Sequence, residues 1–303
     1  MHARLLSYVD EVARQGSIRG ASEKLNVAAS AISRQIKALE DELGTPLFHR
    51  TTRSLTLTSA GEIVLLHIRD TLRDMNRTRA LLEDLKGLRR GEVRVAMMSG
   101  LAANIVSRVV LQFRQTNPWV NIGLQLMTAP DQMIGAIVAG DADLALGFDF
   151  PHRANVRPLA VALAQLGVVV AGDHPFAGRA SVRLAECFDH TMVLADDSTV
   201  IRPRLDQLFG HLGLTPRNVI ETNSIEVMRQ LTMSGKAVTF LTAFDIEIDA
   251  QAGRLRWVPV LELARETQQL VLLGPERNAS ALASVLAEQF KTSMGDGAVG
   301  HRA

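Results

Sequence analysis

From Glu92 onward, short apolar segments alternate with amphipathic ones, and this alternation constrains the fold more than any other feature of the chain. Segments suited to strands lie at about residues 93–98, 120–127, 143–148, 166–171, 191–194, 218–221, 237–241 and 269–273. Helical spacing fills segments at about 102–115, 131–139 and 279–291, and the chain is expected to fray from Gly295. Such alternation favours parallel sheets covered by helices on both faces. We therefore predict an α/β fold for this part.

The first 60 residues follow a different pattern, that of three short helices and a hairpin. Ser17 is a good N-cap for a second helix through Leu25, and Gly44 ends a third helix at about 28–43. An alternating, β-rich run follows at residues 53–58. Together these segments predict a compact helix-turn-helix domain.

The third helix has one apolar and one polar face. The spacing predicts a buried stripe formed by Ile32, Ile36, Leu39 and Leu43. The polar face holds Ser30, Ser33, Arg34 and Lys37. Arginine can bind guanine or phosphate through two hydrogen bonds, so this face suits the major groove of double-stranded DNA. The alternative is an ordinary solvated helix face.

A long helix is predicted from about residue 58 to residue 88. Its apolar positions keep a 3–4 alternation at Leu65, Ile68, Leu72, Met75 and Leu82. A seam of this length favours pairing with a second helix, and we expect dimerisation through Ile68, Leu72, Met75 and Leu82. The alternative is packing of the same side chains against the helix's own domain.

Composition and charge limit the cellular compartment of the protein and the kinds of site that it can contain. Hydrophobic residues make up 47% and charged residues 21%, and no apolar run is long enough for a transmembrane helix. Acidic residues enter too early for a signal peptide, so we expect a cytoplasmic protein. The single cysteine, Cys187, excludes an internal disulfide and a CxxC metal site. Residues 1–90 have a formal charge of +4 and the remainder −3, which suits an N-terminal part that binds a polyanion.

Several segments together resemble LysR-type transcriptional regulators. The run from Ala31 to Gly44 resembles the family's recognition helix, and the run from Ser17 to Leu25 is similar to its second helix. Residues 46–50 (PLFHR) and 57–61 (LTSAG) resemble the wing and the start of the linker helix. The match is detailed over about the first 90 residues and agrees with the rest in outline.

The resemblance implies a winged helix-turn-helix at 1–60, a dimerising linker helix at 61–90 and an effector-binding domain at 91–303. It implies DNA contacts from Ser33, Arg34 and Lys37 and, at the wing, from Arg50 and Arg53, whose alternative role is surface solubility. Ser30 is a candidate from its place on the polar face. Where the family usually has Ser-Gln, this chain has Ala28-Ala29. Loss of a serine cap typically costs ~1 kcal/mol, and Ala29 remains only as an apolar contact for a thymine methyl group.

The resemblance also implies that the effector-binding domain has two α/β subdomains, at 92–161 plus 267–292 and at 162–266, similar to periplasmic binding proteins. Ligands of such sheets bind beyond the carboxyl ends of the strands. That rule and the resemblance together select the effector-binding candidates Ser99, Gly100, Leu101, Thr128, Phe148, Ser198, Thr199, Asn223 and Thr242. Some of these hydroxyl groups are alternatively helix caps.

The hydroxyl groups and helix ends suggest a small anion as effector. The acidic pair Asp196-Asp197 argues against a multiply charged one, unless Arg202 faces the cleft. The resemblance further implies a homodimer, and a tetramer built as a dimer of dimers. No cofactor and no membrane partner are expected.

Two other function classes are open to such a chain, an enzyme and a solute-binding protein. His152, His174, His190 and His211 lie in loop or helix-end contexts, but no nucleophile elbow, phosphate loop or HExxH motif occurs. A solute-binding protein would lack the helix-turn-helix and begin with a signal peptide. We therefore expect a ligand-responsive transcriptional regulator and no enzymatic activity.

Overall fold

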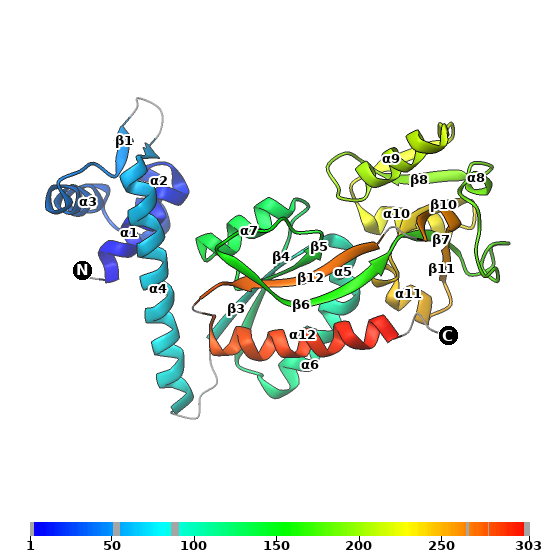
Figure 1. The fold of residues 1–303 in the computed structure, drawn as a ribbon. Helices are drawn as coiled ribbons and strands as arrows, with labels where there is room; N and C mark the ends of the chain where they lie inside the picture. The colour runs from blue at the N-terminus through cyan, green and yellow to red at the C-terminus, as the bar shows by residue number, and fades with distance from the viewer. Residues whose placement is uncertain (1–2, 51–54, 86–90, 265–266, 278, 300–303) are drawn as a thin grey trace. The chain divides into compact units, whose positions relative to one another are not determined.

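The computed structural model describes residues 3–50, 55–85, 91–264, 267–277 and 279–299, with backbone alone for residues 3, 50, 73, 76–77, 79–85 and 296–299. The chain forms two compact units, Met1–Gly87 and Leu88–Ala303. Figure 1 shows the helices and strands of both. None of the described helices is long and apolar enough to cross a membrane.

Three helices form the core of the first unit: α1 (Ala3–Gln15), α2 (Ile18–Leu25) and α3 (Ala29–Leu43). The predicted caps of α2 and α3 are confirmed. The Ser17 side chain accepts a hydrogen bond from the Gly20 backbone N–H at 3.0 Å, and Gly44 takes the left-handed conformation that ends α3. These local signals set the boundaries of the helix-turn-helix.

The helices lead into a short hairpin and a long helix: β1 (Phe48–Arg50), β2 (Leu55–Leu57) and α4 (Ser59–Leu85). Oε1 of Glu40 accepts the Leu47 N–H at 2.8 Å, which ties the hairpin to the end of α3. Gly61 allows α4 to approach this turn, since a Cβ there would lie 2.0 Å from the Leu47 carbonyl oxygen. Ile32, Ile36 and Leu39 are buried as predicted, but Leu43 is 42% exposed because α3 ends where the chain leaves the core.

The second unit contains two five-stranded sheets. The first has the order β4-β3-β5-β12-β6, from β3 (Gly91–Met97), β4 (Val120–Leu126), β5 (Leu144–Phe148), β6 (Val156–Gln165) and β12 (Thr267–Pro275). The second has the order β11-β7-β10-β8-β9, from β7 (Gly167–Ala171), β8 (Thr191–Ala195), β9 (Val219–Thr222), β10 (Ala237–Leu241) and β11 (Leu255–Pro259). Each sheet, with its helices, forms one subdomain with its own core.

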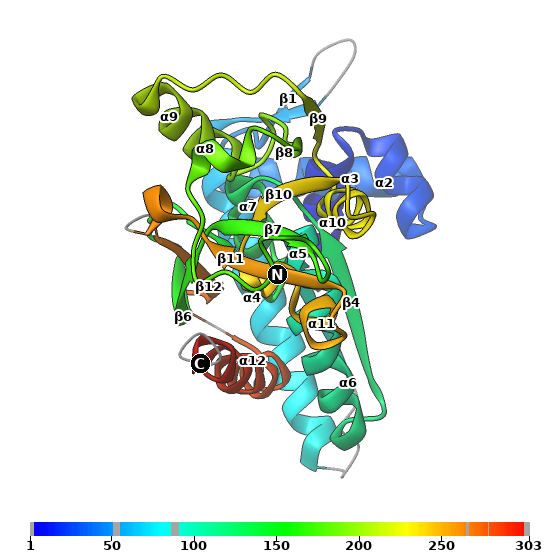
Figure 2. The same ribbon diagram turned by 90° about the vertical axis from the view of Figure 1, so that its right-hand side faces the viewer.

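Helices cover both sheets. α6 and α12 pack beside one another along one face of the first sheet, while α7 covers the other face (Figures 1 and 2). The helical segments of this unit are α5 (Ser99–Leu101), the π-helical η1 (Ala102–Val106), α6 (Ser107–Thr116), α7 (Pro130–Ala139), α8 (Leu184–Cys187), α9 (Arg202–Leu212), α10 (Ile225–Met233), η2 (Ala243–Asp245), α11 (Glu247–Gln251), η3 (Leu261–Leu263) and α12 (Ala281–Val299).

The sheets differ from the prediction in direction. β3, β4 and β5 run parallel, as do β8, β9 and β10, but β12 pairs antiparallel with β5 and β6, and β7 pairs antiparallel with β10 and β11. The chain passes between the sheets through the long strands β6 and β12, which reverses the direction at the crossovers. The last helix also continues to Val299 and does not end near residue 291.

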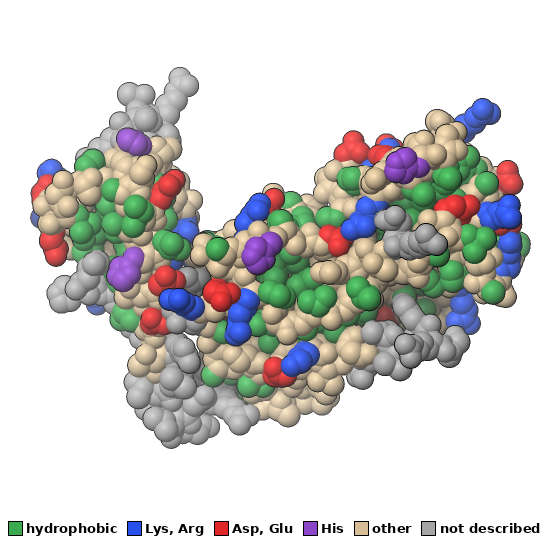
Figure 3. All heavy atoms as spheres, viewed as in Figure 1, with side chains coloured by type: hydrophobic (Ala, Val, Ile, Leu, Met, Phe, Trp, Pro, Cys, Tyr) green, Lys and Arg blue, Asp and Glu red, His purple; other side chains and the backbone are tan. Residues whose placement is uncertain are grey.

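The edge strand β6 exposes part of its apolar surface. Val161 and Leu163 are 52% and 62% exposed, because their side chains alternate with the buried Ala162 and Ala164. The space-filling view shows hydrophobic side chains gathered over this part of the second unit (Figure 3).

Candidate functional site

The first candidate site is the solvent-facing side of α3. Ala29, Ser30, Arg34 and Lys37 are exposed and Ser33 is half-buried, so the predicted polar face lies opposite the buried stripe. Nζ of Lys37 lies 3.5 Å from the Asp41 carboxylate in a surface pair, which leaves its ammonium group available to other partners. This surface can enter a major groove.

The start of α3 and the wing were also singled out by the sequence. Ala28 occupies the N-cap of α3 and provides no side-chain hydrogen bond, so the predicted loss of a cap is confirmed. Of the wing residues, Arg50 ends β1 with its side chain outside the described residues, and Arg53 lies outside them entirely.

The predicted apolar seam of α4 is divided between two environments. Ile68 is fully buried in the core of its own unit, and Leu72 packs partly against that core, so Ile68 is not available to a second chain. Met75 is half-buried, and the Leu82 side chain lies outside the described residues. The exposed apolar side chains of the described half of α4 are Ile63 (73%) and Leu66 (41%), which the sequence pattern missed.

The second candidate site is a cavity between the two subdomains of the second unit. Its volume is about 40 Å³, enough for roughly three water molecules. It is lined by Met98, Ser99, Gly100, Met127, Thr128 and Phe148 from the first subdomain and by Thr199, Val200, Ile201, Asn223, Ile225 and Asp245 from the second. The cavity therefore lies at the carboxyl ends of strands from both subdomains.

Six of the nine residues predicted from the strand-end rule line this one cavity: Ser99, Gly100, Thr128, Phe148, Thr199 and Asn223. Leu101 does not, because its side chain is fully buried in the core. Ser198 lies outside and donates to Oδ1 of Asp196 at 2.6 Å. Thr242 is buried and donates to Oδ2 of Asp245 at 2.7 Å, so its hydroxyl group is a cap of η2.

Six other lining residues were not predicted: Met98, Met127, Val200, Ile201, Ile225 and Asp245. Each methionine immediately precedes a predicted position, and Sδ of Met98 accepts the Phe148 N–H at 3.4 Å across the ends of β3 and β5. Extending the strand-end rule by one residue toward the N-terminus would have included both methionines. Nothing local to Asp245 indicates its role, because it reaches the cavity from a 3₁₀ turn after β10.

Comparison with known proteins places both sites in one family. Residues 3–62 match the model of the bacterial regulatory helix-turn-helix of the lysR family, and residues 86–295 match the LysR substrate-binding domain. The chain belongs to the LysR family.

Relatives and solved structures agree with this assignment. The LysR-family chain is 30% identical over 258 residues to the RuBisCO operon transcriptional regulator of Allochromatium vinosum, covering 84% of each. It is 27% identical over 292 residues to the regulator CbbR of Rhodospirillum rubrum, covering 96% of each. A full-length variant of OxyR from Pseudomonas aeruginosa shares the fold with a TM-score of 0.71 at 19% identity, covering 97% of this chain and 94% of OxyR. CbnR in complex with its target DNA shares it with a TM-score of 0.54 at 22% identity, covering 97% and 100%.

Family membership establishes the general function. This LysR-family protein is a DNA-binding transcriptional regulator with an effector-binding domain, and it is not an enzyme. Regulators of this family bind DNA and small-molecule effectors and form oligomers.

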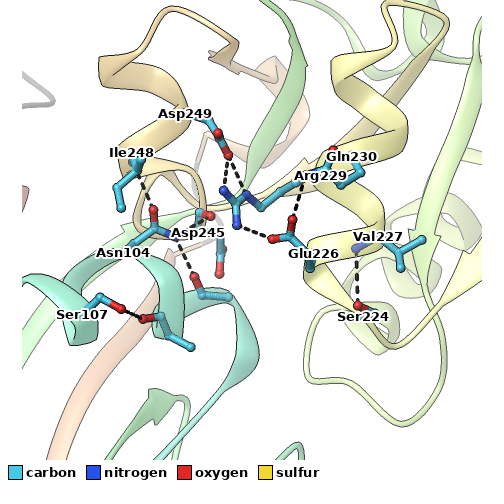
Figure 4. Close-up of polar contacts among 12 residues, drawn as sticks. Asn104, Ser107, Ser224, Glu226, Val227, Arg229, Gln230, Asp245, Ile248 and Asp249 are labelled. Carbon is cyan, nitrogen blue, oxygen red and sulfur yellow. Dashed lines mark hydrogen bonds and ion pairs between the residues drawn. The ribbon is translucent and has the colours of Figure 1, made fainter.

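The two subdomains of the regulator meet at Asn104. Its Nδ2 donates to the carbonyl oxygens of Gly100 (2.9 Å) and Asp245 (2.8 Å), and its Oδ1 accepts the Ile248 N–H at 3.0 Å (Figure 4). Asn104 has non-helical angles (φ −103°, ψ −110°) within the π-helical segment. One fully buried amide therefore joins the first subdomain to η2 and α11 of the second.

Two ion pairs also connect the subdomains. Nη2 of Arg108 lies 2.9 Å from Glu247, and Nη2 of Arg204 lies 2.7 Å from Oδ2 of Asp149. Asp149 directly follows the lining residue Phe148 and has a positive φ of 51°. Its Oδ1 accepts the Gln269 N–H at 3.0 Å, which holds the carboxylate toward Arg204.

Two of the histidines considered above, His174 and His190, pack against each other, and Cys187 is buried. His174 and His190 have ring centroids 4.8 Å apart beside Phe176, and burial, followed by the His190 charge, lowers the pKa of His174. Burial raises the pKa of the Cys187 thiol to about 12. Among the described residues, no group of three or more His, Cys, Asp or Glu side chains is placed to hold a metal ion.

Proposed function

We propose that this regulator reads its operator through α3 and responds to a small molecule bound in the cavity between its subdomains. The observation that supports the proposal best is the convergence of six predicted residues, from two separate sheets, on one cavity. A ligand that prefers one arrangement of the subdomains would shift the population between arrangements. That shift would change how dimers are placed on DNA. Because DNA is the partner, we also place the protein in the cytoplasm.

For DNA recognition we propose contacts from Ser30, Ser33, Arg34 and Lys37, with Ala29 against a thymine methyl group and Arg50 and Arg53 at the wing. Arg34 is the strongest candidate, since it is exposed on α3 and a guanidinium group can bind a guanine through two hydrogen bonds.

Replacing Arg34 with alanine should weaken operator binding by about 1–3 kcal/mol, or roughly 5–150-fold in Kd. Gel shifts on DNA upstream of the chain's own gene would measure this, with far-UV circular dichroism to check the fold. Arg256→Ala is the matched control, because it removes an exposed arginine from β11 in the other unit. Wild-type affinity in Arg34→Ala would exclude Arg34 as a reader.

We propose that the regulator forms a homodimer through α4, and a tetramer from two such dimers. The exposed side chains of Ile63 and Leu66 support α4 as the interface, because large apolar side chains on a helix surface favour contact with a partner. Leu72, Met75 and Leu82 extend the same proposal toward the C-terminal half of the helix.

For effector binding we propose Ser99, Gly100, Thr128, Phe148, Thr199 and Asn223 as contacts. Thr199 also stabilises its own turn, since its Oγ1 donates to the Asp196 carbonyl oxygen at 2.9 Å. A thermal-shift screen of metabolites on the full chain would identify a ligand, because a bound molecule stabilises the native state by mass action.

Ser99→Ala and Thr199→Ala should each weaken binding of the ligand so identified by roughly 2–10-fold, the cost of one neutral hydrogen bond. Ser198→Ala is the control, because this neighbouring hydroxyl group lies outside the cavity. Isothermal titration would give the affinities, and melting curves would show any loss of a cap. Unchanged affinity in both Ser99→Ala and Thr199→Ala would place the effector elsewhere.

A further inference from the structure

The cavity is mostly apolar. Met98, Met127, Phe148, Val200, Ile201 and Ile225 form half of its lining, and Ser99, Thr128, Thr199 and Asn223 add uncharged polar groups. Of the described residues that line it, Asp245 alone has an ionisable side chain. A hydroxyl group can form a hydrogen bond with either a donor or an acceptor of the ligand, so the hydroxyl groups set no charge preference. The charge preference of the cavity therefore depends on the carboxyl group of Asp245.

Asp245 is held in place from both subdomains. Its Oδ2 accepts the Thr242 N–H at 2.9 Å and the Thr242 hydroxyl at 2.7 Å. Its Oδ1 lies against Gly100, where a Cβ would be 1.9 Å away, so only glycine allows this approach. The residue is 3% exposed. The side chain therefore cannot turn away to make room for a second negative group.

The arginines around the cavity already have carboxylate partners. Arg229 binds Asp249 and Glu226 (Figure 4). Arg202, which the sequence suggested as a counter-charge, instead binds Asp206 at 2.8 Å and Glu221 at 2.6 Å.

Arg204 binds Asp149, as described above. A buried anion needs a partner charge, and two carboxylates in one buried site cannot both ionise readily. Burial raises the pKa of Asp245, against the hydrogen bonds from Thr242 and the charge of Arg229, because this site disfavours even one negative charge.

We propose that Asp245 makes this cavity selective for a small ligand with an apolar body and an uncharged or cationic hydrogen-bond-donating end, and against carboxylates and phosphates. This inference rests on the proposed function, that the effector binds in this cavity. It replaces the small anion expected from the hydroxyl groups and helix ends.

The test uses matched triplets of compounds that are small enough for a cavity of about 40 Å³: methanol, methylamine and formate, and ethanol, ethylamine and acetate. All are added to the full chain. The alcohol or amine of a triplet should stabilise the wild type more than the carboxylate does. Asp245→Asn keeps an oxygen for Thr242 and removes the charge, so it should raise carboxylate affinity relative to the alcohol by about tenfold or more. Asp197→Asn, which changes an exposed carboxylate of the same subdomain, should leave the ranking unchanged.

The ranking on the wild type tests the inference even where Asp245→Asn folds poorly. A carboxylate that stabilises the wild type best, with the same ranking in Asp245→Asn, would overturn it. If the favoured compound stabilises Ser99→Ala and Thr199→Ala as well as the wild type, it binds outside the cavity. In that case the proposed function fails, and the charge preference fails with it.

Discussion

Replacing Leu66 with aspartate should turn the proposed dimer into a monomer and weaken operator binding by roughly 10²–10⁴-fold, because two half-sites would no longer be bound together. Leu66 is 41% exposed on its own unit, so the charge costs little in the monomer. Between two paired helices, the same unpaired charge would be buried and costly. Light scattering at micromolar concentration and gel shifts would measure the two effects.

Two further variants separate the interface from the fold. His67→Asp places a charge on the adjacent exposed position and should preserve the dimer. Leu72→Asp should lower the melting temperature as well as dimerisation, because Leu72 also packs against the core of its own unit. A Leu66→Asp protein that stays dimeric and binds its operator normally would show that α4 does not pair through this side.

Replacing Asp249 with asparagine should destabilise the effector-binding domain by about 3–5 kcal/mol, the typical cost of removing one partner from a buried ion pair. The Asp249 side chain is 1% exposed and binds both Arg229 and Arg254, and Arg229 is itself 8% exposed. The variant would leave the Arg229 charge buried with only Glu226 as partner. Urea unfolding would measure the loss, and Asp197→Asn, at an exposed position, should change it little.

The same carboxylate should make stability depend on pH. Burial alone would raise the pKa of Asp249, but hydrogen bonds from Arg229 and Arg254 outweigh it and lower the pKa. A carboxylate whose pKa is lower in the folded state contributes its full stability at pH values above its unfolded pKa of about 3.9. This contribution disappears as the pH falls through the folded pKa. Wild type should therefore lose its advantage over Asp249→Asn in acid. A difference between the two that stays constant from pH 7 to pH 3 would contradict this account.

The parts of the structure that local chemistry determines were predictable. The helix starting after Ser17 and the helix ending at Gly44 depend on a hydroxyl cap and on one left-handed glycine, and both signals lie next to the boundary that they set. The same holds for Ser99, Thr128 and Thr199, because a ligand site at strand ends needs only the strands to be placed.

The parts that depend on distant contacts were not predictable. β6 contains Pro158 and an irregular apolar pattern, and it is a strand because it pairs with β12, more than a hundred residues later. Ile68 has the spacing of a pairing seam, yet contact with its own domain buries it. Asp245 reaches the cavity only because Gly100, in the other subdomain, leaves space for it.

The pairing of β6 with β12 has a consequence for engineering. Gln165, the last residue of β6, pairs directly with Thr267, the first residue of β12, so residues 166–266 leave and re-enter the first sheet at neighbouring points. A segment whose two ends lie close together can be inserted or exchanged without disturbing the rest of the fold. It provides half of the cavity lining, including Asp245. Exchanging this one segment between related regulators would transfer half of a chemical specificity while leaving the DNA-reading part of the chain unchanged.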